Sequence, residues 1–490
     1  MKILFATPEC APWVKTGGLG DVSGALPAAL AALGHDVRVL LPAYRGMRVS
    51  GELGDGVDLP ARGPWPAAQL LPVKADNGVT LLLLAAPSLY QRAGGPYVDA
   101  GGADYHDNVL RFGFLGRIAA LLGTPASPLG DWRADIVHAN DWPCGLAPLY
   151  LRQARELAPR QPMAASVMTI HNMAFQGTFA MDNADRLGIP GIWRGIDGVE
   201  FWGQLSMLKA GLQFADAITT VSPTYAREIQ TPAFGVGLDG VLRARSAHLT
   251  GILNGIDTAA WNPASDVQLL HHFSAGDLAA KARNKAGLQA QLGLAAAPQA
   301  PLFGVVSRLT SQKGIDLVLQ NLDAVLAGGG QLAVLGLGDP ALQAALRDAA
   351  ARAPRQVHVT LGFNEQLAHR IEAGADCFLM PSRFEPCGLN QMYSQAYGTP
   401  PLVNATGGLV DSVVDADDDP KGGTGFVMRS ADAAGFAEAL GRVRQAWQDP
   451  ARWRRIQANG MARPFGWDAS ARRYLEVYAQ AMAAAAEPVA

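Results

Sequence analysis

Two cations and a carboxylate occur in segments where they could bind a phosphorylated or hydroxyl-rich ligand. Arg308 and Lys313 lie five residues apart in a loop that follows a predicted strand at residues 302–306. Cations held in such a loop can neutralise the charge that grows on a departing diphosphate. Glu385 follows a second apolar run, residues 377–380, and its carboxylate could bind sugar hydroxyls or cap a helix. These residues predict an anion and sugar site, with solvated surface charges as the simpler alternative.

A glycine-bearing loop separates the first predicted strand, residues 2–6, from a helix predicted at residues 21–33. Glycine there lets backbone N–H groups approach an anion, and the helix N-terminus adds positive potential. A second Thr-Gly-Gly-Leu sequence follows the apolar run at residues 401–403. This matching placement would let one loop from each domain bind the same diphosphate. The alternative for the first loop is a tight turn beside a solvated lysine. The residues concerned are Lys15, Gly17, Gly18, Thr406, Gly407 and Gly408.

Polar and aromatic side chains also follow two other predicted strands. Asp141 and Trp142 come after residues 136–138, and His171 comes directly after residues 166–170. Polar groups and rings at strand ends indicate recognition of a polyol, because tryptophan faces pack on sugars. A single histidine more often only satisfies a local hydrogen bond.

Cofactor signals are weaker. A G-x-G-x-x-A sequence at residues 336–341 resembles a dinucleotide fingerprint, but the first strand of neither domain carries one. The acidic residues 415–419 resemble a metal-binding D-x-D motif, yet the Pro-Lys-Gly-Gly that follows favours a solvated acidic loop. The pair at residues 271–272 is two histidines without a partner cluster, and no Walker A sequence occurs. We therefore expect no metal and no organic cofactor.

Alternating strands and helices with short glycine loops predict doubly wound parallel sheets, whose ligands bind outside the carboxyl ends of the strands. We expect an N-terminal domain over residues 1–255 and a second α/β domain over residues 256–465. Residues 466–490 are expected to hold a last helix, for which packing on the N-terminal domain is one arrangement. The Gly- and Pro-rich residues 51–67 are predicted to be a surface excursion.

The composition is that of a folded protein without a general attraction for polyanions. Of the 490 residues 49% are hydrophobic and 17% are charged, and the net charge of -3 gives no reason to expect nucleic acid or an anionic membrane as partner. Four widely spaced cysteines are typical of reduced thiols. No signal-peptide pattern and no apolar run of about 20 residues occurs. We predict a cytoplasmic location, with the oligomeric state left open.

Seven segments carry a family resemblance, and they occur in a characteristic order. They resemble the bacterial glycogen synthases and plant starch synthases, and the resemblance extends over residues 1–478. It implies the GT-B fold, with two Rossmann-like domains facing across a deep cleft. It also implies transfer of glucose from ADP-glucose to the non-reducing end of glycogen or another α-1,4-glucan, with retention of configuration and without a metal. The segments are residues 15–19, 141–142, 171–177, 253–257, 307–314, 381–388 and 406–409.

The resemblance also implies roles for single residues. Lys15 and the glycines after it match an ADP-glucose-binding loop, Arg308 and Lys313 match cations on the diphosphate, and Glu385 matches a group that holds the donor glucose. The implied catalytic residues are Glu385, Asp141, His171, Arg308 and Lys313. The implied substrate-binding residues are Lys15, Gly17, Gly18, Glu9, Asp21, Asn172, Asn254, Phe363, Cys387, Asn390, Thr406, Gly407 and Gly408.

Four positions depart from the family pattern. Asn140 replaces a common histidine, Asn390 stands where threonine is usual, and Asn404 replaces a more basic residue. Phe363 falls where a tyrosine usually stacks on the adenine, so the ring is kept and its hydroxyl is lost. None of these changes removes a core group, although donor affinity could differ. The alternatives are another GT-B enzyme that uses UDP-glucose or a small acceptor, and a non-catalytic glucan-binding protein.

Overall fold

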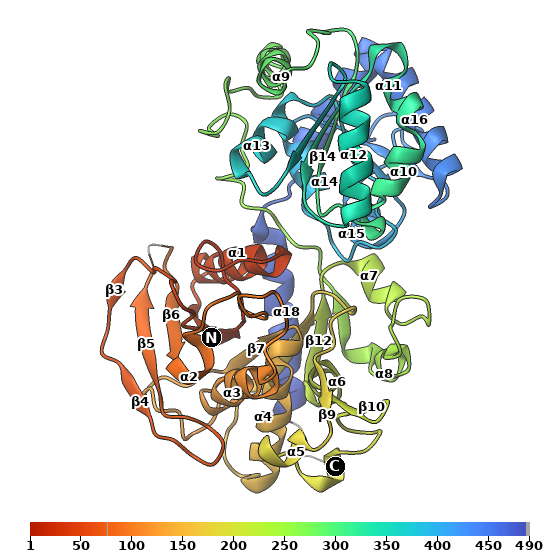
Figure 1. The fold of residues 1–490 in the computed structure, drawn as a ribbon. Helices are drawn as coiled ribbons and strands as arrows, with labels where there is room; N and C mark the ends of the chain where they lie inside the picture. Colours follow the sequence, from red (N-terminus) through yellow and green to blue (C-terminus); the bar gives the residue numbers. More distant parts are fainter. Residues whose placement is uncertain (76, 487–490) are drawn as a thin grey trace. The chain divides into compact units, whose positions relative to one another are not determined.

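The computed structural model describes residues 1–75 and 77–486, which form two compact units. Unit 1 comprises the described residues of Met1–Gly255 together with residues 467–486, and unit 2 comprises Ile256–Gly466. Each unit is built on a largely parallel β-sheet with helices on both faces (Figure 1). The predicted doubly wound α/β class is confirmed.

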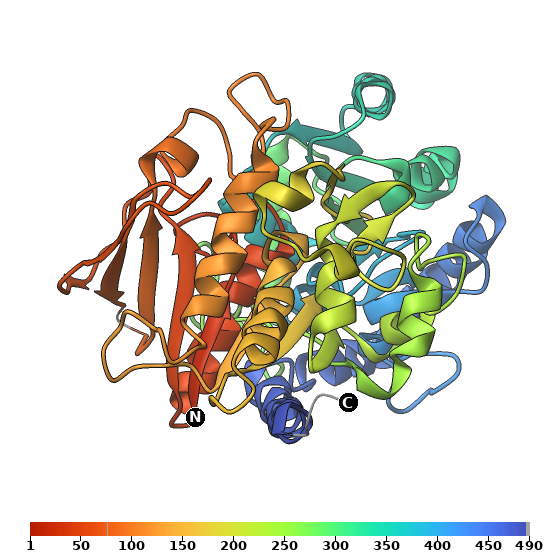
Figure 2. The same cartoon turned by 90° about the horizontal axis from the view of Figure 1, so that it is seen from below.

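The sheet of unit 1 has ten strands, in the order β13-β12-β8-β7-β1-β2-β6-β5-β3, with β4 also paired to β5. The pairs from β13 to β6 are parallel, and β5 pairs antiparallel with β6, β3 and β4 at one edge of the sheet (Figure 2). The strands are β1 (Lys2–Ala6), β2 (Asp36–Pro42), β3 (Glu52–Leu53), β4 (Val57–Leu59), β5 (Ala68–Lys74), β6 (Thr80–Ala85), β7 (Ile136–Asn140), β8 (Ala165–Ile170), β12 (Ala217–Thr220) and β13 (Leu249–Gly251).

The C-terminal helix α18 (Trp467–Ala486) belongs to the core of unit 1. It packs against α1 (Gly18–Ala32), β8 and β12, and its Tyr474 and Tyr478 are fully buried with Phe5 of β1. The Tyr478 hydroxyl lies 2.8 Å from Nδ1 of His138 on β7, a polar contact inside this core. The chain therefore returns to its first domain after leaving unit 2.

The other helices of unit 1 pack on the sheet and on each other. Helix α3 contacts α4, β1 and β7, and α4 also contacts β7 and β8. A small antiparallel sheet in the order β10-β11-β9 lies outside the main one. These elements are α2 (Pro87–Tyr90), α3 (Asn108–Leu121), α4 (Leu146–Leu157), α5 (Asn183–Arg186), α6 (Met207–Phe214), α7 (Pro223–Glu228), α8 (Asp239–Ala244), β9 (Thr178–Ala180), β10 (Glu200–Phe201) and β11 (Gln204–Ser206), with short 3-10 turns η1 (Trp142–Cys144), η2 (Gly191–Trp193) and η3 (Ser246–His248).

Unit 2 has a six-stranded parallel sheet in the order β16-β15-β14-β17-β18-β19. Leucines of α9 and α13 form one apolar cluster on it, and side chains of α10, α12, α16 and α17 form another. The elements are α9 (Ala279–Leu292), β14 (Leu302–Val306), η4 (Ser311–Lys313), α10 (Ile315–Gln320), α11 (Leu322–Leu326), η5 (Ala327–Gly329), β15 (Gln331–Gly336), α12 (Pro340–Arg352), β16 (Val357–Leu361), α13 (Glu365–Gly374), β17 (Cys377–Met380), α14 (Asn390–Ala396), β18 (Pro401–Asn404), α15 (Gly407–Ser412), β19 (Phe426–Met428), α16 (Ala433–Trp447) and α17 (Pro450–Met461).

Each sheet contains a point where the strand order reverses. In unit 1 the chain runs from β1 to β2 on one side and returns with β7 on the other side of β1. In unit 2 it runs from β14 through β15 to β16 and returns with β17 beside β14. Ligands of doubly wound sheets bind in the crevice that such a reversal opens at the carboxyl ends of the strands. The loops after β1, β7, β14 and β17 are therefore where a site is expected.

Helices α10 and α11 are separated by a break at Asn321, whose side-chain amide donates to the carbonyls of Leu317 and Ala433 and so ties the break to α16. One expectation needs correction. Residues 51–67 are not only a surface excursion, because β3 and β4 extend the main sheet from within them. Within the described residues, none of the helices has the length and apolar character that crossing a bilayer requires.

Candidate functional site

In unit 2, Lys313 and Glu385 form a close ion pair at the reversal point of the sheet. Lys313 ends the loop after β14, Glu385 lies in the loop after β17, and the Lys313 Nζ is 2.5 Å from the Glu385 Oε2. Ser382 Oγ donates to the same Oε2 over 3.0 Å. Both side chains are largely buried, with exposed fractions of 15% and 8%. Because both hydrogen bonds end on Oε2, the carboxylate is held in one orientation with its other oxygen turned away from Lys313.

The glycines around this pair allow its loops to approach closely. A Cβ on Gly407 would lie 1.9 Å from the Glu385 carbonyl oxygen, and one on Gly408 would lie 2.2 Å from the Cys387 carbonyl oxygen. Gly314 has a φ of +71°, and a Cβ there would lie 2.2 Å from the Pro381 oxygen. Since only glycine fits these approaches, the Thr406–Gly408 and Lys313–Gly314 turns are packed directly on the segment that carries Glu385. Three loops distant in sequence are thus assembled around one carboxylate.

Three other predicted residues of unit 2 follow β14, follow β16 or begin α14. Arg308 is exposed and donates to Gln312 Oε1 over 3.3 Å. Asn390 begins α14 and donates over 2.6 Å to the Val306 carbonyl at the end of β14, so it ties the helix that follows β17 to the end of β14. Phe363 follows the edge strand β16 and is 84% exposed. An exposed ring of this size is available to stack on a flat ligand.

The glycines of residues 336–341 have a structural explanation. A Cβ on Gly336 would lie 1.9 Å from the Ser307 oxygen, and one on Gly338 would lie 2.2 Å from the Leu309 oxygen. These glycines let the loop that carries Arg308 pack closely against them. This close packing, and not the binding of a dinucleotide, explains their presence.

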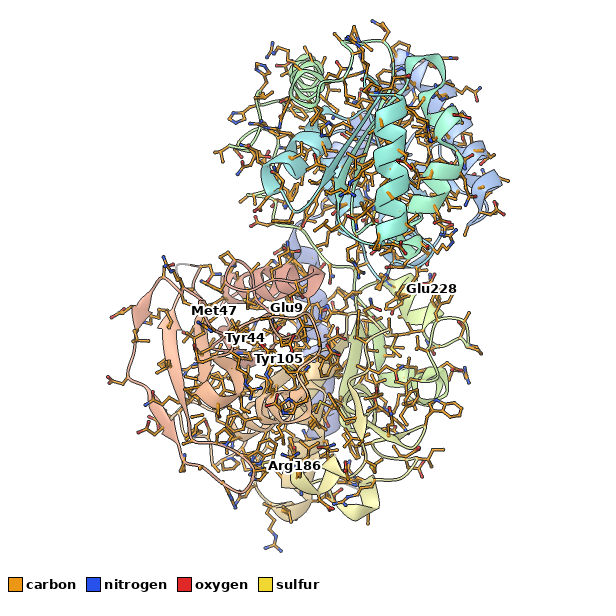
Figure 3. All side chains as sticks on the ribbon, viewed as in Figure 1. Glu9, Tyr44, Met47, Tyr105, Arg186 and Glu228 are labelled. Atoms are coloured by element: carbon orange, nitrogen blue, oxygen red, sulfur yellow. The ribbon has the colours of Figure 1, made fainter. Side chains whose placement is uncertain are left out.

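In unit 1, Glu9 lies in the loop between β1 and α1 (Figure 3), and its carboxylate organises that loop through hydrogen bonds. It accepts hydrogen bonds from the Thr16 amide over 2.5 Å, the Thr16 hydroxyl over 2.6 Å and the Tyr97 hydroxyl over 2.6 Å. The Gly17 amide is 3.3 Å from the same carboxylate. The amides of Thr16 and Gly17 are therefore directed at Glu9, which is 3% exposed.

The remaining residues of this loop are open to solvent. Lys15 Nζ pairs with Asp21 Oδ1 over 2.6 Å, and their side chains are 43% and 28% exposed. No atom lies within 4 Å of a Cβ placed on Gly17 or Gly18. This open space leaves room for a ligand to approach the backbone at the start of α1.

Asp141 and His171 lie together at the ends of neighbouring strands β7 and β8. The His171 amide lies 3.4 Å from Asp141 Oδ1, and His171 Nε2 lies 3.0 Å from Asn140 Oδ1. The Asn140 amide nitrogen donates to the Ala6 carbonyl, so its oxygen must be the acceptor for the histidine. His171 Nε2 therefore carries the proton, and the histidine is neutral, because burial lowers its pKa to about 3.

Asp141 combines strain with an unusual pKa. Its φ of 55° and ψ of -178° lie in a region that is almost reserved for glycine. Burial raises its pKa to about 7, against the opposing effect of hydrogen bonds from the backbone at His171, Asn172 and Trp142. Glu9 adds to the rise by its negative charge. Perturbed carboxylates and strained backbones both cluster at functional sites.

Two further predicted residues of unit 1, Asn172 and Asn254, follow strands of the main sheet, and the backbone of Asn172 hydrogen-bonds to Asp141. Asn172 is half-buried and its side-chain oxygen accepts the Ala174 amide. Asn254 follows β13, at the opposite edge of the sheet from β3, and its side chain is 6% exposed. Its Oδ1 is buried and accepts no hydrogen bond from the described residues.

The acidic segment at residues 415–419 is not the solvated loop that its composition predicts. Asp415 is buried, lies 2.9 Å from Arg442 and accepts the Val427 amide over 2.6 Å. Asp417 pairs with Arg442 and Arg452. These carboxylates join the segment to α16 and α17. No group of three or more potential metal-ligating side chains is found in the described part of the chain.

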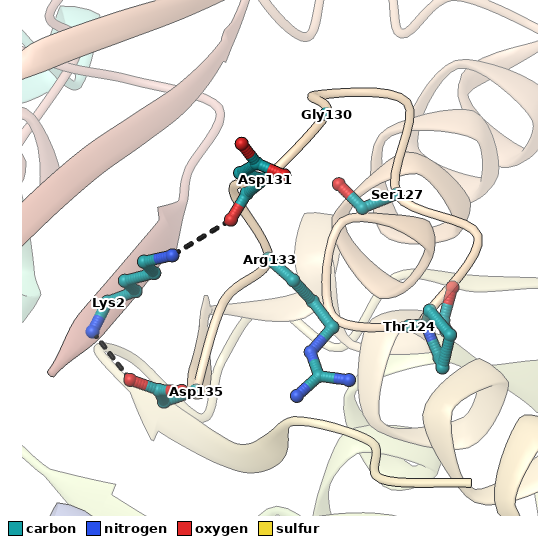
Figure 4. A pocket seen from close by; sticks show the side chains of 8 residues that line it. Lys2, Thr124, Ser127, Gly130, Asp131, Arg133 and Asp135 are labelled. Atoms are coloured by element: carbon teal, nitrogen blue, oxygen red, sulfur yellow. Dashed lines mark hydrogen bonds between the residues drawn. The ribbon is translucent and has the colours of Figure 1, made fainter.

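A pocket of about 420 Å³ opens at the other end of the unit 1 strands (Figure 4). Lys2 at the start of β1 donates through its amide to Asp135 and through its Nζ to the Asp131 carbonyl. Arg133 lines the same pocket. Because this pocket lies at the amino ends of the strands, it is separate from the loops described above.

Comparison with known proteins gives the family. Residues 2–244 match the family described as "Starch synthase catalytic domain", and residues 293–459 match "Glycosyl transferases group 1". A glycogen synthase of Paracidovorax citrulli is 63% identical over 98% of this chain and 95% of its own length. The chain belongs to the bacterial glycogen synthase and plant starch synthase family. A second member of this synthase family, from Aromatoleum aromaticum, is 54% identical over 99% of this chain and 98% of its own.

Solved structures agree with this family assignment. The catalytic domain of starch synthase IV from Arabidopsis thaliana, bound to ADP and acarbose, has a TM-score of 0.86 and 33% identity, over 98% of this chain and 99% of that one. The predicted GT-B fold is thereby shown. A sucrose-phosphate synthase from Thermosynechococcus elongatus, with a TM-score of 0.59 and 20% identity over 99% of each chain, shares the fold.

Two residues of the candidate site were not predicted. Tyr97 donates to Glu9 from 88 positions away, and nothing in its sequence context marks it. Ser382 donates to Glu385, and its place directly after a buried strand and just before Arg-Phe-Glu was a signal that could have identified it.

Proposed function

We propose that this chain is a glycogen synthase that transfers glucose from ADP-glucose to the non-reducing end of an α-1,4-glucan, releases ADP and retains the anomeric configuration. The observation that carries the proposal is the buried Lys313–Glu385 pair at the reversal point of unit 2, in a chain 63% identical to a glycogen synthase. The related structure bound to ADP and acarbose supports a nucleotide donor and a glucan acceptor.

In the proposed donor site, unit 2 binds the nucleotide sugar. Lys313 and Arg308 neutralise the diphosphate, and the Glu385 carboxylate accepts hydroxyls of the donor glucose through the oxygen that Lys313 and Ser382 leave available. Phe363 stacks on the adenine, which its 84% exposure supports. The departure of ADP is assisted by two cations, because negative charge grows on the diphosphate as the glycosidic bond breaks.

In the proposed acceptor site, unit 1 orients the glucan hydroxyls. Asp141 accepts hydroxyl hydrogens when it is ionised, and neutral His171 offers its Nδ1 as an acceptor, since Nε2 donates to Asn140. Glu9, held by Thr16 and Tyr97, keeps the loop at the start of α1 in place. The ring of Trp142 follows Asp141 and packs edge-on against Phe112, which fixes the wall beside the carboxylate.

The proposed reaction needs no protein nucleophile and no metal. ADP leaves from the face of the sugar that the acceptor hydroxyl attacks, and a diphosphate oxygen takes the hydroxyl proton. The protein contributes positioning and charge stabilisation. The cysteines Cys10, Cys144 and Cys377 are buried free thiols, which suits a reducing compartment such as the cytoplasm.

A chain-extension experiment tests the proposal. The protein is incubated with ADP-glucose and maltoheptaose, and the products are digested with β-amylase, which cleaves only α-1,4 linkages. We expect longer maltooligosaccharides that β-amylase degrades completely. Products that resist β-amylase would refute retention, and the absence of extension would refute the transferase activity.

A further inference from the structure

An exposed tryptophan occupies the tip of the hairpin between β10 and β11. Phe201 pairs with Gln204, so Trp202 and Gly203 form a two-residue turn, and their φ angles are 52° and 78°. Turns with positive φ at both positions strongly prefer Asn-Gly. A bulky residue in this conformation is unfavourable by about 1–3 kcal/mol. Trp202 is nevertheless 83% exposed, so burial of its ring does not compensate for the strain.

A second strained residue lies against the same turn. Val236 has a φ of 49° and is 48% exposed, and a Cβ placed on the adjacent Gly237 would lie 3.1 Å from Phe201 and 3.3 Å from Trp202 Nε1. The described residues contain three non-glycine positions with positive φ, and the third is Asp141 of the candidate site. Strain that is not offset by packing is retained where it positions a side chain for a ligand.

The turn borders a pocket of about 410 Å³, which is within the size range of small-ligand sites. Its lining contains no charged side chain; it combines two aromatic rings with two amides and one hydroxyl. Phe175, which is 52% exposed, is adjacent in sequence to two lining residues. The lining residues are Ala174, Gln176, Thr178, Phe201, Trp202 and Gln204.

Gln176, which lines this pocket, has a buried side-chain oxygen without a hydrogen-bond partner in the described structure. Its side chain is 8% exposed, and its amide nitrogen donates to the Val236 carbonyl over 2.9 Å. That bond orients the amide, so Oε1 must be the remaining atom, and Oε1 is buried without a hydrogen-bond partner in the described structure. A buried acceptor left unpaired costs free energy.

We propose that Trp202, with Gln176, Thr178 and Gln204, forms an auxiliary subsite that binds a segment of the α-1,4-glucan chain. The indole face packs on a pyranose ring, while the amides and the Thr178 hydroxyl bond to sugar hydroxyls. A neutral, hydroxyl-rich chain fits a lining that has rings and amides but no charge. This inference rests on the proposed function, since it concerns how the same enzyme holds its polymeric acceptor.

Retention by glycogen in native gels tests the subsite without any donor. The variant Trp202→Asn removes the ring and installs the Asn-Gly pair that this turn prefers, so it should fold at least as well as the original. We expect its apparent Kd for glycogen to rise about tenfold, the scale of losing one aromatic contact. The apparent Kd of Trp202→Tyr should lie between those of the original protein and Trp202→Asn. Leu157→Ala, which removes another exposed apolar side chain of unit 1, should leave retention unchanged.

Kinetics separate this inference from the proposed function. The loss in kcat/KM of Trp202→Asn with glycogen should exceed its loss with maltotriose about tenfold, because only a long chain reaches a second subsite. If the unsubstituted protein fails to transfer glucose to any acceptor, the proposed function is wrong, while gel retention still decides the subsite. Equal retention of the unsubstituted protein and Trp202→Asn, or no retention of either, would overturn the subsite.

Discussion

The Lys313 ammonium lies 2.5 Å from the Glu385 carboxylate, across 72 residues of sequence. A donor diphosphate that binds Lys313 must share this cation with Glu385. The pair therefore links the charge on the leaving group to the carboxylate that we assign to the donor sugar.

Replacing Lys313 by alanine should cost about 3 kcal/mol of transition-state stabilisation, or about a hundredfold in kcat, because one preorganised cation is lost. The measurement is the rate of ADP release at saturating ADP-glucose and glycogen. Lys421→Ala, which removes an exposed lysine of the same unit, is the matched control and should keep the original rate. Near-normal turnover of Lys313→Ala would remove Lys313 from the catalytic residues.

The raised pKa of Asp141 predicts a dependence on pH. If its carboxylate accepts acceptor hydroxyls, kcat/KM should rise with pH through about 7, the pKa of the buried carboxyl. Asp141→Asn should lose this inflection and fall at least about tenfold in kcat/KM, since a charged acceptor is replaced by a neutral one. If the pH profile of Asp141→Asn kept the original inflection, that inflection would belong to another titrating group.

The same carboxyl should also appear in the stability of unit 1. Its pKa is higher in the folded protein than the ordinary 3.8, so the folded state binds more protons between pH 4 and 7. The unfolding free energy therefore falls with rising pH across this interval and levels above it. Asp141→Asn lacks this titrating carboxyl group. The unfolding free energy of the variant, compared with that of the original protein, should therefore increase from pH 4 to 7, as measured by thermal melts.

Phe363 provides a test of adenine recognition. Phe363→Ala should raise KM for ADP-glucose about tenfold with little change in kcat, because a stacking contact is lost equally from ground and transition states. Phe363→Tyr keeps the ring, and its KM for ADP-glucose should stay within about twofold of the original value. Val267→Ala, another exposed apolar side chain of unit 2, is the control. An unchanged KM in Phe363→Ala would place the adenine elsewhere.

Asp415 is predicted to stabilise unit 2 rather than to bind a metal. Burial opposes its ionisation, but hydrogen bonds from Arg442 and from the amides of Val427 and Asp417 outweigh this and lower its pKa. Asp415→Asn removes the most buried of the three carboxylates that pair with Arg442 and should cost roughly 3 kcal/mol.

The Tm of Asp415→Asn should fall well below that of Asp418→Asn, whose exposed pair with Arg429 contributes little. The contribution of Asp415 is present above its unfolded pKa and is lost as the pH falls below about 4. Restoration of activity by added Mn²⁺ in either variant would instead support a metal role.

Local patterns in the sequence were sufficient to predict the strands that carry the site. The apolar runs at residues 2–6, 302–306 and 377–380 coincide with β1, β14 and β17, because short buried strands bounded by glycine and proline leave a clear signal. Both Thr-Gly-Gly-Leu segments lie at helix starts, as expected from their placement.

What the sequence did not reveal depends on contacts between distant residues. The bond from Tyr97 to Glu9 and the pairing of Asp415 with Arg442 join separate elements, so no spacing rule finds them. The break at Asn321 arises from a bond to α16 that local helix propensity ignores.

The most direct test of the proposed function is ADP release from ADP-glucose, measured with and without glycogen, in EDTA, and with UDP-glucose in parallel. We predict release that requires glycogen, survives EDTA, prefers the adenine donor and falls about a hundredfold in Lys313→Ala. Preference for UDP-glucose would contradict the assigned donor, loss of activity in EDTA would contradict the metal-free reaction, and no turnover with either donor would contradict the synthase itself.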